Sequence, residues 1–141
     1  MSRIFWDTML FAYLLEDHPS YAVRVRQLLA RAHRRRDRLY TSHLALGELM
    51  AGAGQSSQRN APESVREALI QMGFSFLPFG AEAVAPFSKL RSKERIKAPD
   101  AIHLACAASA GIDLFLTGDK QLMRLDVPGI QFIADFNAPI L

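Results

Sequence analysis

The chain has 141 residues, half of them hydrophobic and 22% of them charged, a composition typical of globular proteins that excludes an intrinsically disordered chain. The single cysteine, Cys106, excludes an internal disulfide, and no uncharged apolar run reaches the length of a membrane-spanning helix. The net charge is +3. We therefore expect one soluble, cytoplasmic domain over residues 1–141, with no signal peptide and no membrane contact.

The first part of the chain predicts a strand, two helices and a second strand. Arg3–Trp6 is a short β-prone run, and the apolar spacing of residues 9–16 predicts an amphipathic helix that Thr8 caps. A second helix is expected from about Tyr21 to the basic run of residues 31–38. Residues 39–41 then form a second short strand.

The middle of the chain continues this alternation. Ser42 is a natural N-cap for a helix over residues 44–51, which places Glu48 in the second helical turn. Residues 52–60 are rich in Gly, Ser and Gln and predict a polar loop. The next elements are expected to be a helix over residues 62–72, a strand at Phe74–Leu77 and a surface helix over residues 81–96.

Residues 97–120 carry the most informative pattern. Pro99 and Asp100 suit the first turn of a helix, and the Ala-rich segment that follows ends at Gly111, a natural C-cap. A buried strand at residues 114–116, a turn at 117–119 and a last strand at 130–133 complete the chain. Strands that alternate with helices at this spacing predict an α/β fold with a mainly parallel sheet of four to five strands.

Four acidic residues stand where such a sheet would bring them together. Asp7 and Asp119 follow strands, Asp100 opens a helix, and Glu48 lies on the helix after the second strand. Two carboxylates about 5 Å apart repel by roughly 3 kcal/mol at an effective dielectric near 20, so four of them require protons or a hard divalent cation. Ligands that are all oxygen favour Mg²⁺ or Mn²⁺ over Zn²⁺. Taken singly, each acid is also explained as a turn residue, a helix-dipole partner or a solvated side chain.

Four segments together resemble the PIN-domain ribonucleases, and among these the VapC-type toxins of bacterial toxin–antitoxin pairs. The matching segments are residues 5–8, 44–49, 99–105 and 116–119, in the order and approximate spacing of the family. The segment around Asp100 is the most specific of the four. One position departs from the family pattern: Met9 stands where the family often has Asn, which affects a polar contact behind the metal ligands and leaves the ligands themselves intact.

The resemblance implies both a fold and an activity. It implies a three-layer α/β/α domain that hydrolyses RNA with Mg²⁺ or Mn²⁺, with Asp7, Asp100 and Asp119 as metal ligands and Glu48 as the fourth catalytic acid. It also implies a cognate antitoxin protein as partner, and we expect a homodimer. A basic surface around an acidic pocket suits a polyanionic substrate.

Several further residues are candidates for supporting roles. His103 lies one helical turn after Asp100, and Thr8 and Thr117 lie beside the first and last acids; all three are expected to contact the acids or to serve only as structural residues. The candidates for RNA contact, which are otherwise solvated basic residues, are Lys93, Arg95, Lys97 and Arg35.

Two other function classes compete with the nuclease. A haloacid-dehalogenase-like phosphatase also places an Asp after the first strand, but it needs a second Asp where this chain has Met9. A non-catalytic RNA- or protein-binding module would use the acids only to complete the fold. Stabilisation by a divalent metal distinguishes the nuclease from such a module.

Overall fold

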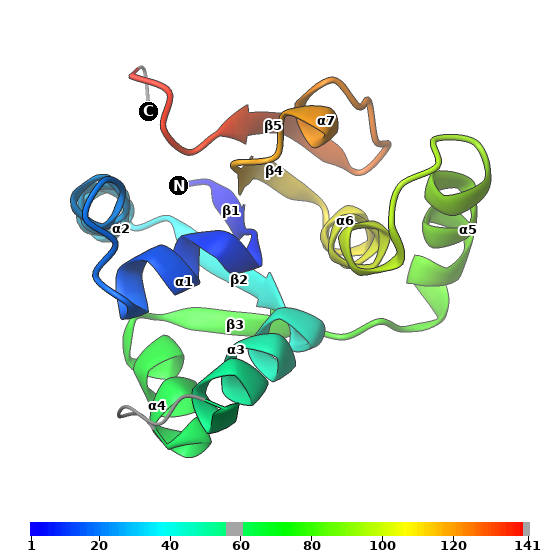
Figure 1. Ribbon diagram of the computed structural model, residues 1–141. Coiled ribbons are helices and arrows are strands. Elements are labelled where there is room, and N and C mark those ends of the chain that lie inside the picture. The colour runs from blue at the N-terminus through cyan, green and yellow to red at the C-terminus, as the bar shows by residue number, and fades with distance from the viewer. Residues whose placement is uncertain (56–60, 140–141) are drawn as a thin grey trace.

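The computed structural model describes residues 1–55 and 61–139, and it contains a five-stranded, entirely parallel sheet between two layers of helices (Figure 1). The strand order is β3-β2-β1-β4-β5. The strands are β1 (Arg3–Trp6), β2 (Arg38–Ser42), β3 (Phe74–Leu77), β4 (Ile112–Thr117) and β5 (Ile130–Asp135). The expected three-layer α/β fold is confirmed.

The helices divide between the two faces of the sheet. One face packs against α1 (Thr8–Leu15), α2 (Ala22–Arg35), α3 (His43–Gln55) and α4 (Pro62–Gln71). The other face packs against α5 (Val84–Ser92), α6 (Ala98–Ala110) and the short α7 (Lys120–Met123), and a 3₁₀ turn, η1 (Ala81–Ala83), precedes α5. No helix in the described ranges is long and apolar enough to cross a bilayer.

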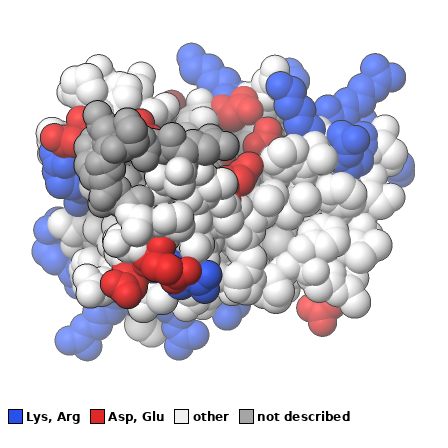
Figure 2. Space-filling view, turned by 60° about the horizontal axis from the view of Figure 1, so that its bottom comes forward, with Lys and Arg blue, Asp and Glu red and all other residues white. Residues whose placement is uncertain are grey.

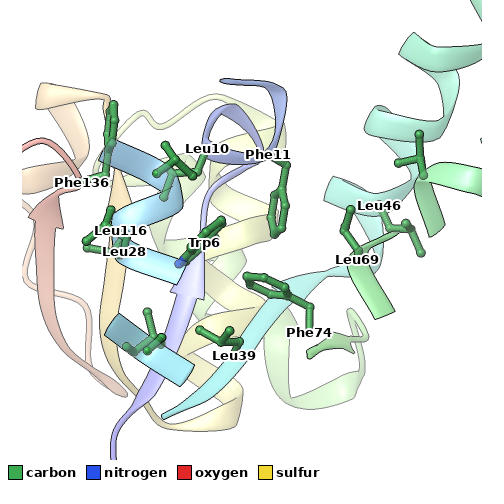
Figure 3. Close-up of a cluster of buried hydrophobic side chains, with 14 residues drawn as sticks. Trp6, Leu10, Phe11, Leu28, Leu39, Leu46, Leu69, Phe74, Leu116 and Phe136 are labelled. Atoms are coloured by element: carbon green, nitrogen blue, oxygen red, sulfur yellow. The ribbon is translucent and has the colours of Figure 1, made fainter. Parts of the chain in front are cut away.

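The central strand β1 supplies both halves of the core, because successive side chains of a strand point to opposite faces. Trp6 is 1% exposed and packs against Phe11 and Phe74, with ring centroids 5.2 and 4.9 Å away (Figure 3). Phe5 points to the other face and stacks on Phe115 at 4.8 Å. A strand buried on both faces is what a continuous apolar run such as residues 4–6 predicts in a parallel sheet.

Two local expectations are corrected. Asp7, not Thr8, is the N-cap of α1, because the Asp7 carboxylate accepts the Thr8 N–H. The predicted polar loop begins later, since α3 continues to Gln55; residues 56–60 lie outside the described chain. Met50 and Ala53 are partly buried and pack against the core. The stabilisation from this packing exceeds the helix-propensity cost of the glycines in that segment.

The predicted surface helix over residues 81–96 is also shorter than expected. It divides into η1 and α5, and α5 ends at Ser92. Arg95 then adopts a left-handed backbone with φ 57°, and this turn brings Ile96 into the core, where it is 8% exposed. The burial of one apolar side chain therefore ends the helix and leads the chain into α6.

Candidate active site

The four acids predicted from the sequence line one pocket. Asp7 follows β1 and Asp119 follows β4, and these two strands are paired, so their carboxyl ends lie side by side. Asp100 lies in the first turn of α6 and Glu48 on α3. The pocket has a volume of ≈ 320 Å³, and its remaining walls are Thr8, Met9, Pro99 and His103.

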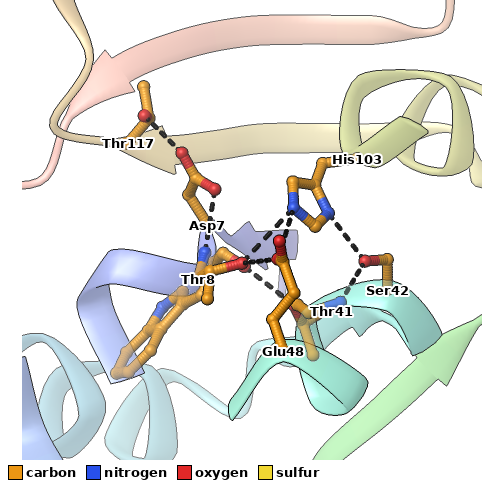
Figure 4. Close-up of polar contacts among 9 residues, drawn as sticks. Asp7, Thr8, Thr41, Ser42, Glu48, His103 and Thr117 are labelled. Atoms are coloured by element: carbon orange, nitrogen blue, oxygen red, sulfur yellow. Dashed lines mark hydrogen bonds and ion pairs between the residues drawn. The ribbon is translucent and has the colours of Figure 1, made fainter. Parts of the chain in front are cut away.

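Asp7 is the most firmly held of the acids. It is 5% exposed, and its two carboxylate oxygens accept hydrogen bonds from the Thr8 N–H at 2.8 Å and from the Thr117 hydroxyl at 2.7 Å (Figure 4). The Asp7 N–H in turn donates to the Leu116 carbonyl at 3.0 Å. Charge-assisted hydrogen bonds of this kind fix the orientation of a carboxylate before any ligand arrives.

Thr117 connects the first and last acids. Its hydroxyl donates to Asp7 and accepts the Asp119 N–H at 3.1 Å. Asp119 caps α7 by accepting the Gln121 N–H at 2.9 Å, which leaves its second carboxylate oxygen for the pocket. The structure therefore places Thr117 behind both carboxylates as a shared support.

The pocket is electrostatically unfavourable for Asp100. Burial raises the pKa of the Asp100 carboxyl above its ordinary value, and Asp7, Asp119 and Glu48 raise it further, while His103 opposes the shift. Desolvation and like charges both disfavour an ionised carboxylate. A cation in this pocket would relieve the repulsion that these carboxylates exert on one another.

Glu48 is attached to a second polar network that runs through His103. The Glu48 Oε1 atom accepts the Thr8 hydroxyl at 3.2 Å and lies 3.4 Å from His103 Nε2. On the other side of the ring, His103 Nδ1 lies 2.7 Å from the Ser42 hydroxyl, and that hydroxyl oxygen also accepts the Ala45 N–H. In the neutral ring this pattern makes the Ser42 hydroxyl the donor to Nδ1. The imidazole proton is then on Nε2 and faces Glu48.

Ser42 is the member of this network that the sequence reasoning missed, because we expected it only as a helix cap. Ser42 is the last residue of β2, just as Trp6 is the last residue of β1. Its position at a strand end is the feature of the sequence that could have predicted a place beside the acids. Carboxyl ends of parallel strands meet at one edge, which brings Ser42 to the side of the sheet that carries the acids.

The donor set fits a hydrated divalent cation. Within residues 1–55 and 61–139, no three His, Cys, Asp or Glu side chains are close enough to bind one metal ion together. Mg²⁺ characteristically binds one or two carboxylates directly and keeps several waters, so it does not require three converging side chains. The pocket supplies carboxylate oxygens, which are the ligands that such an ion prefers.

The candidate RNA-contacting residues lie in two separate places. Lys93, Arg95 and Lys97 are exposed and belong to the turn between α5 and α6 that leads to Asp100. Arg35 lies instead near the start of β2 and forms an ion pair with Asp37 at 3.5 Å. This is the side of the sheet where the strands begin, whereas the acids lie where the strands end. On the face drawn in Figure 2, acidic side chains gather in a hollow with Lys and Arg side chains beside it.

A family model for the PIN domain matches residues 4–128, a span that includes all four acids. The chain belongs to the PIN-domain family. The fold is similar to a chain of the VapBC2 complex of Rickettsia felis bound to a promoter DNA fragment, with 18% identity and a TM-score of 0.71, covering 94% of this chain and 97% of the other. No curated protein matches the chain in sequence.

Two further solved structures are similar to this chain in fold. DNA-bound VapBC from Salmonella typhimurium is 21% identical, with a TM-score of 0.71 over 96% of this chain and 99% of that chain. A toxin–antitoxin complex from Klebsiella pneumoniae is 20% identical, with a TM-score of 0.63 over 92% and 95% of the two chains.

Proposed function

We propose that this PIN-domain chain is an endoribonuclease that hydrolyses RNA phosphodiester bonds with Mg²⁺ or Mn²⁺. The observation that carries the proposal is the pocket that Asp7, Glu48, Asp100 and Asp119 line together, although they come from four separate segments. Such a group of acids disfavours its own ionisation, as the raised pKa of Asp100 indicates, and a divalent cation offsets that cost.

We assign three roles to the residues of the chain, namely binding the cation, orienting the attacking water and contacting the RNA. Asp7, Asp100 and Asp119 would hold the cation, one or two of them by direct contact and the rest through waters. When bound, the cation neutralises phosphate charge and lowers the pKa of water. Glu48, oriented by Thr8 and His103, accepts a proton from the attacking water or aligns it. The exposed Lys93, Arg95 and Lys97 would contact phosphates of the RNA on the approach to Asp100.

A homodimer remains our expectation from the sequence. We propose further that the chain is the toxin of a toxin–antitoxin pair. The similarity of its fold to VapBC and other toxin–antitoxin complexes supports this proposal. The partner we expect is an antitoxin whose Arg or Lys side chain enters the acidic pocket in place of the cation. Expression of the chain alone should slow growth, and co-expression of a small antitoxin encoded beside it should restore growth.

A PIN-like module without catalysis is the remaining candidate. The rigid hydrogen bonding of Asp7 and the network around Glu48 favour the nuclease, because a scaffold gains nothing from carboxylates oriented into an open pocket. The experiment is RNA cleavage by the purified chain with Mn²⁺ and with excess chelator, together with the melting temperature under both conditions. Cleavage and stabilisation by Mn²⁺ support the nuclease, whereas neither would occur in a vacant scaffold.

A further inference from the structure

A second cavity lies between the sheet and α2, away from the acidic pocket. Its volume is ≈ 110 Å³, and the acidic pocket contributes no residue to it. The inner walls are apolar side chains of β1, β4 and α2, namely Ile4, Trp6, Leu28, Ala32, Leu114 and Leu116. The mouth is polar and is formed by Ser2, Arg31, Arg35 and Asp37.

Trp6 brings an unpaired hydrogen-bond donor to this cavity. The side chain is 1% exposed, yet its indole N–H has no hydrogen-bond partner among the described residues. The nitrogen-bearing edge of the ring is turned toward Leu28 and Leu116, two of the cavity walls (Figure 3). Every fully buried polar side-chain atom in the described chain does have a partner, so the Trp6 nitrogen must open onto the cavity. A buried indole N–H normally meets an acceptor.

The charges at the mouth favour an anion. Asp37 is already compensated, since it accepts the Ser2 N–H at 2.8 Å and pairs with Arg35 and with the N-terminal amine. Arg31 is exposed and makes no hydrogen bond or ion pair with the described residues. One guanidinium is therefore available at the entrance to an apolar cavity that contains one unpaired N–H donor.

We propose that this cavity binds a small carboxylate with a short, branched aliphatic chain. The aliphatic part lies against Ile4, Leu28 and Leu114, and the carboxylate accepts from the Trp6 N–H and from the Arg31 guanidinium. The cavity is smaller than the roughly 150 Å³ apolar cavity that holds benzene, which limits the chain to about three to five carbons. The proposal involves none of the four acids and stands apart from the nuclease reaction.

Trp6 is the only tryptophan of the chain, so the site carries its own spectroscopic probe. The experiment titrates the purified full chain with isovalerate while following tryptophan fluorescence and the single indole N–H resonance. We expect saturable changes in both, with the resonance shifting as the N–H gains an acceptor. The matched probes are 3-methylbutan-1-ol, which lacks the charge, 3-methylbutan-1-amine, which reverses it, and acetate, which lacks the branched chain. All three should bind at least about tenfold more weakly.

Two variants test the assigned contacts. Arg31→Gln should weaken isovalerate binding by about tenfold, because it removes a hydrogen bond to a charged group. Arg34→Gln is the matched control on the same helix, since Arg34 is exposed and absent from the cavity wall, and it should leave binding unchanged. Trp6→Phe, followed by calorimetry, should also weaken binding. An absent saturable response to isovalerate, an equal response to the alcohol, or equal effects of Arg31→Gln and Arg34→Gln would overturn the proposal and leave a cavity filled by water.

Discussion

The Nδ1 atom of His103 lies 2.7 Å from the hydroxyl oxygen of Ser42, and both side chains are buried. The two residues come from different layers, His103 from α6 and Ser42 from the end of β2. Their contact holds the opposite edge of the imidazole toward Glu48 and Thr8. We therefore propose that His103 positions the Glu48 carboxylate, which lines the acidic pocket.

Two amide substitutions of His103 separate these contacts. In His103→Gln the amide nitrogen reaches the place of Nε2 and keeps a donor for Glu48. In His103→Asn the amide oxygen reaches the place of Nδ1 and accepts the Ser42 hydroxyl, but no donor is left for Glu48. Both variants should lose about 1–3 kcal/mol of stability because a buried polar group loses a partner. RNA cleavage rates should separate them, with His103→Gln the more active. Equal kcat values for two equally stable variants would mean that the ring has a structural role only.

The raised pKa of Asp100 predicts a pH-dependent cost of folding. The folded state holds the Asp100 proton more tightly than the unfolded state, so stability is full below the ordinary aspartate pKa and falls as the pH rises through the higher, folded value. Asp100→Asn should therefore melt at a higher temperature than the parent chain at neutral pH in chelator. This advantage should vanish below about pH 3, where the carboxyl is protonated in both the folded and the unfolded state.

Asp126→Asn is the matched control for that measurement, because Asp126 is exposed and lies outside the acidic pocket. It should leave the melting temperature unchanged at both pH values. A lower melting temperature for Asp100→Asn at neutral pH, or an advantage that persists in acid, would show that repulsion among the carboxylates does not reach Asp100.

Met9 packs against the turn that carries Asp119. A Cβ atom added to Gly118 would lie 2.6 Å from the Met9 sulfur and 3.1 Å from Cε1 of Phe136, a residue that is 3% exposed. Gly118→Ala should therefore cost about 1–3 kcal/mol through overpacking. Adding Met9→Ala should recover part of this cost, since it removes the closer contact. Chemical denaturation of the single and double variants measures the coupling.

Gly47→Ala provides the control, because a Cβ atom at Gly47 meets nothing within 4 Å and the residue lies inside α3. It should stabilise the chain by about 0.5–1 kcal/mol through helix propensity alone. A double variant as unstable as the sum of Gly118→Ala and Met9→Ala would show that Met9 does not limit the space at this turn. The contact also gives Met9 a packing role at the position where related chains often carry Asn.

The features that the sequence could predict are those that short segments determine. The β-prone run Arg3–Trp6 is a strand with those bounds. Helix α6 begins beside Pro99 and is capped by Gly111, whose φ of 70° suits glycine. Cys106 is buried, and burial raises the pKa of its thiol to about 11, which suits a core residue and not a nucleophile.

The features that the sequence could not predict depend on contacts between distant segments. The extension of α3 to Gln55 comes from packing, and the early end of α5 comes from the burial of Ile96. The pairing of Ser42 with His103 joins residues 61 positions apart, which local patterns do not report. Arg35 was a candidate for RNA contact because of its charge. It lies where the strands begin, away from the acids, and only the arrangement of the strands in the sheet shows this.

The most direct test of the nuclease is the rate of RNA cleavage by the parent chain, Asp100→Asn and Asp126→Asn at equal concentration with Mn²⁺. Both variants remove one carboxylate charge, but only Asp100 faces the acidic pocket. We predict cleavage by the parent chain and by Asp126→Asn, its loss in excess chelator, and a decrease of at least about 100-fold in Asp100→Asn, since catalysis through a bound cation depends on its ligands. Cleavage by Asp100→Asn at the parental rate, or cleavage that persists in chelator, would contradict the assignment of this pocket as the active site.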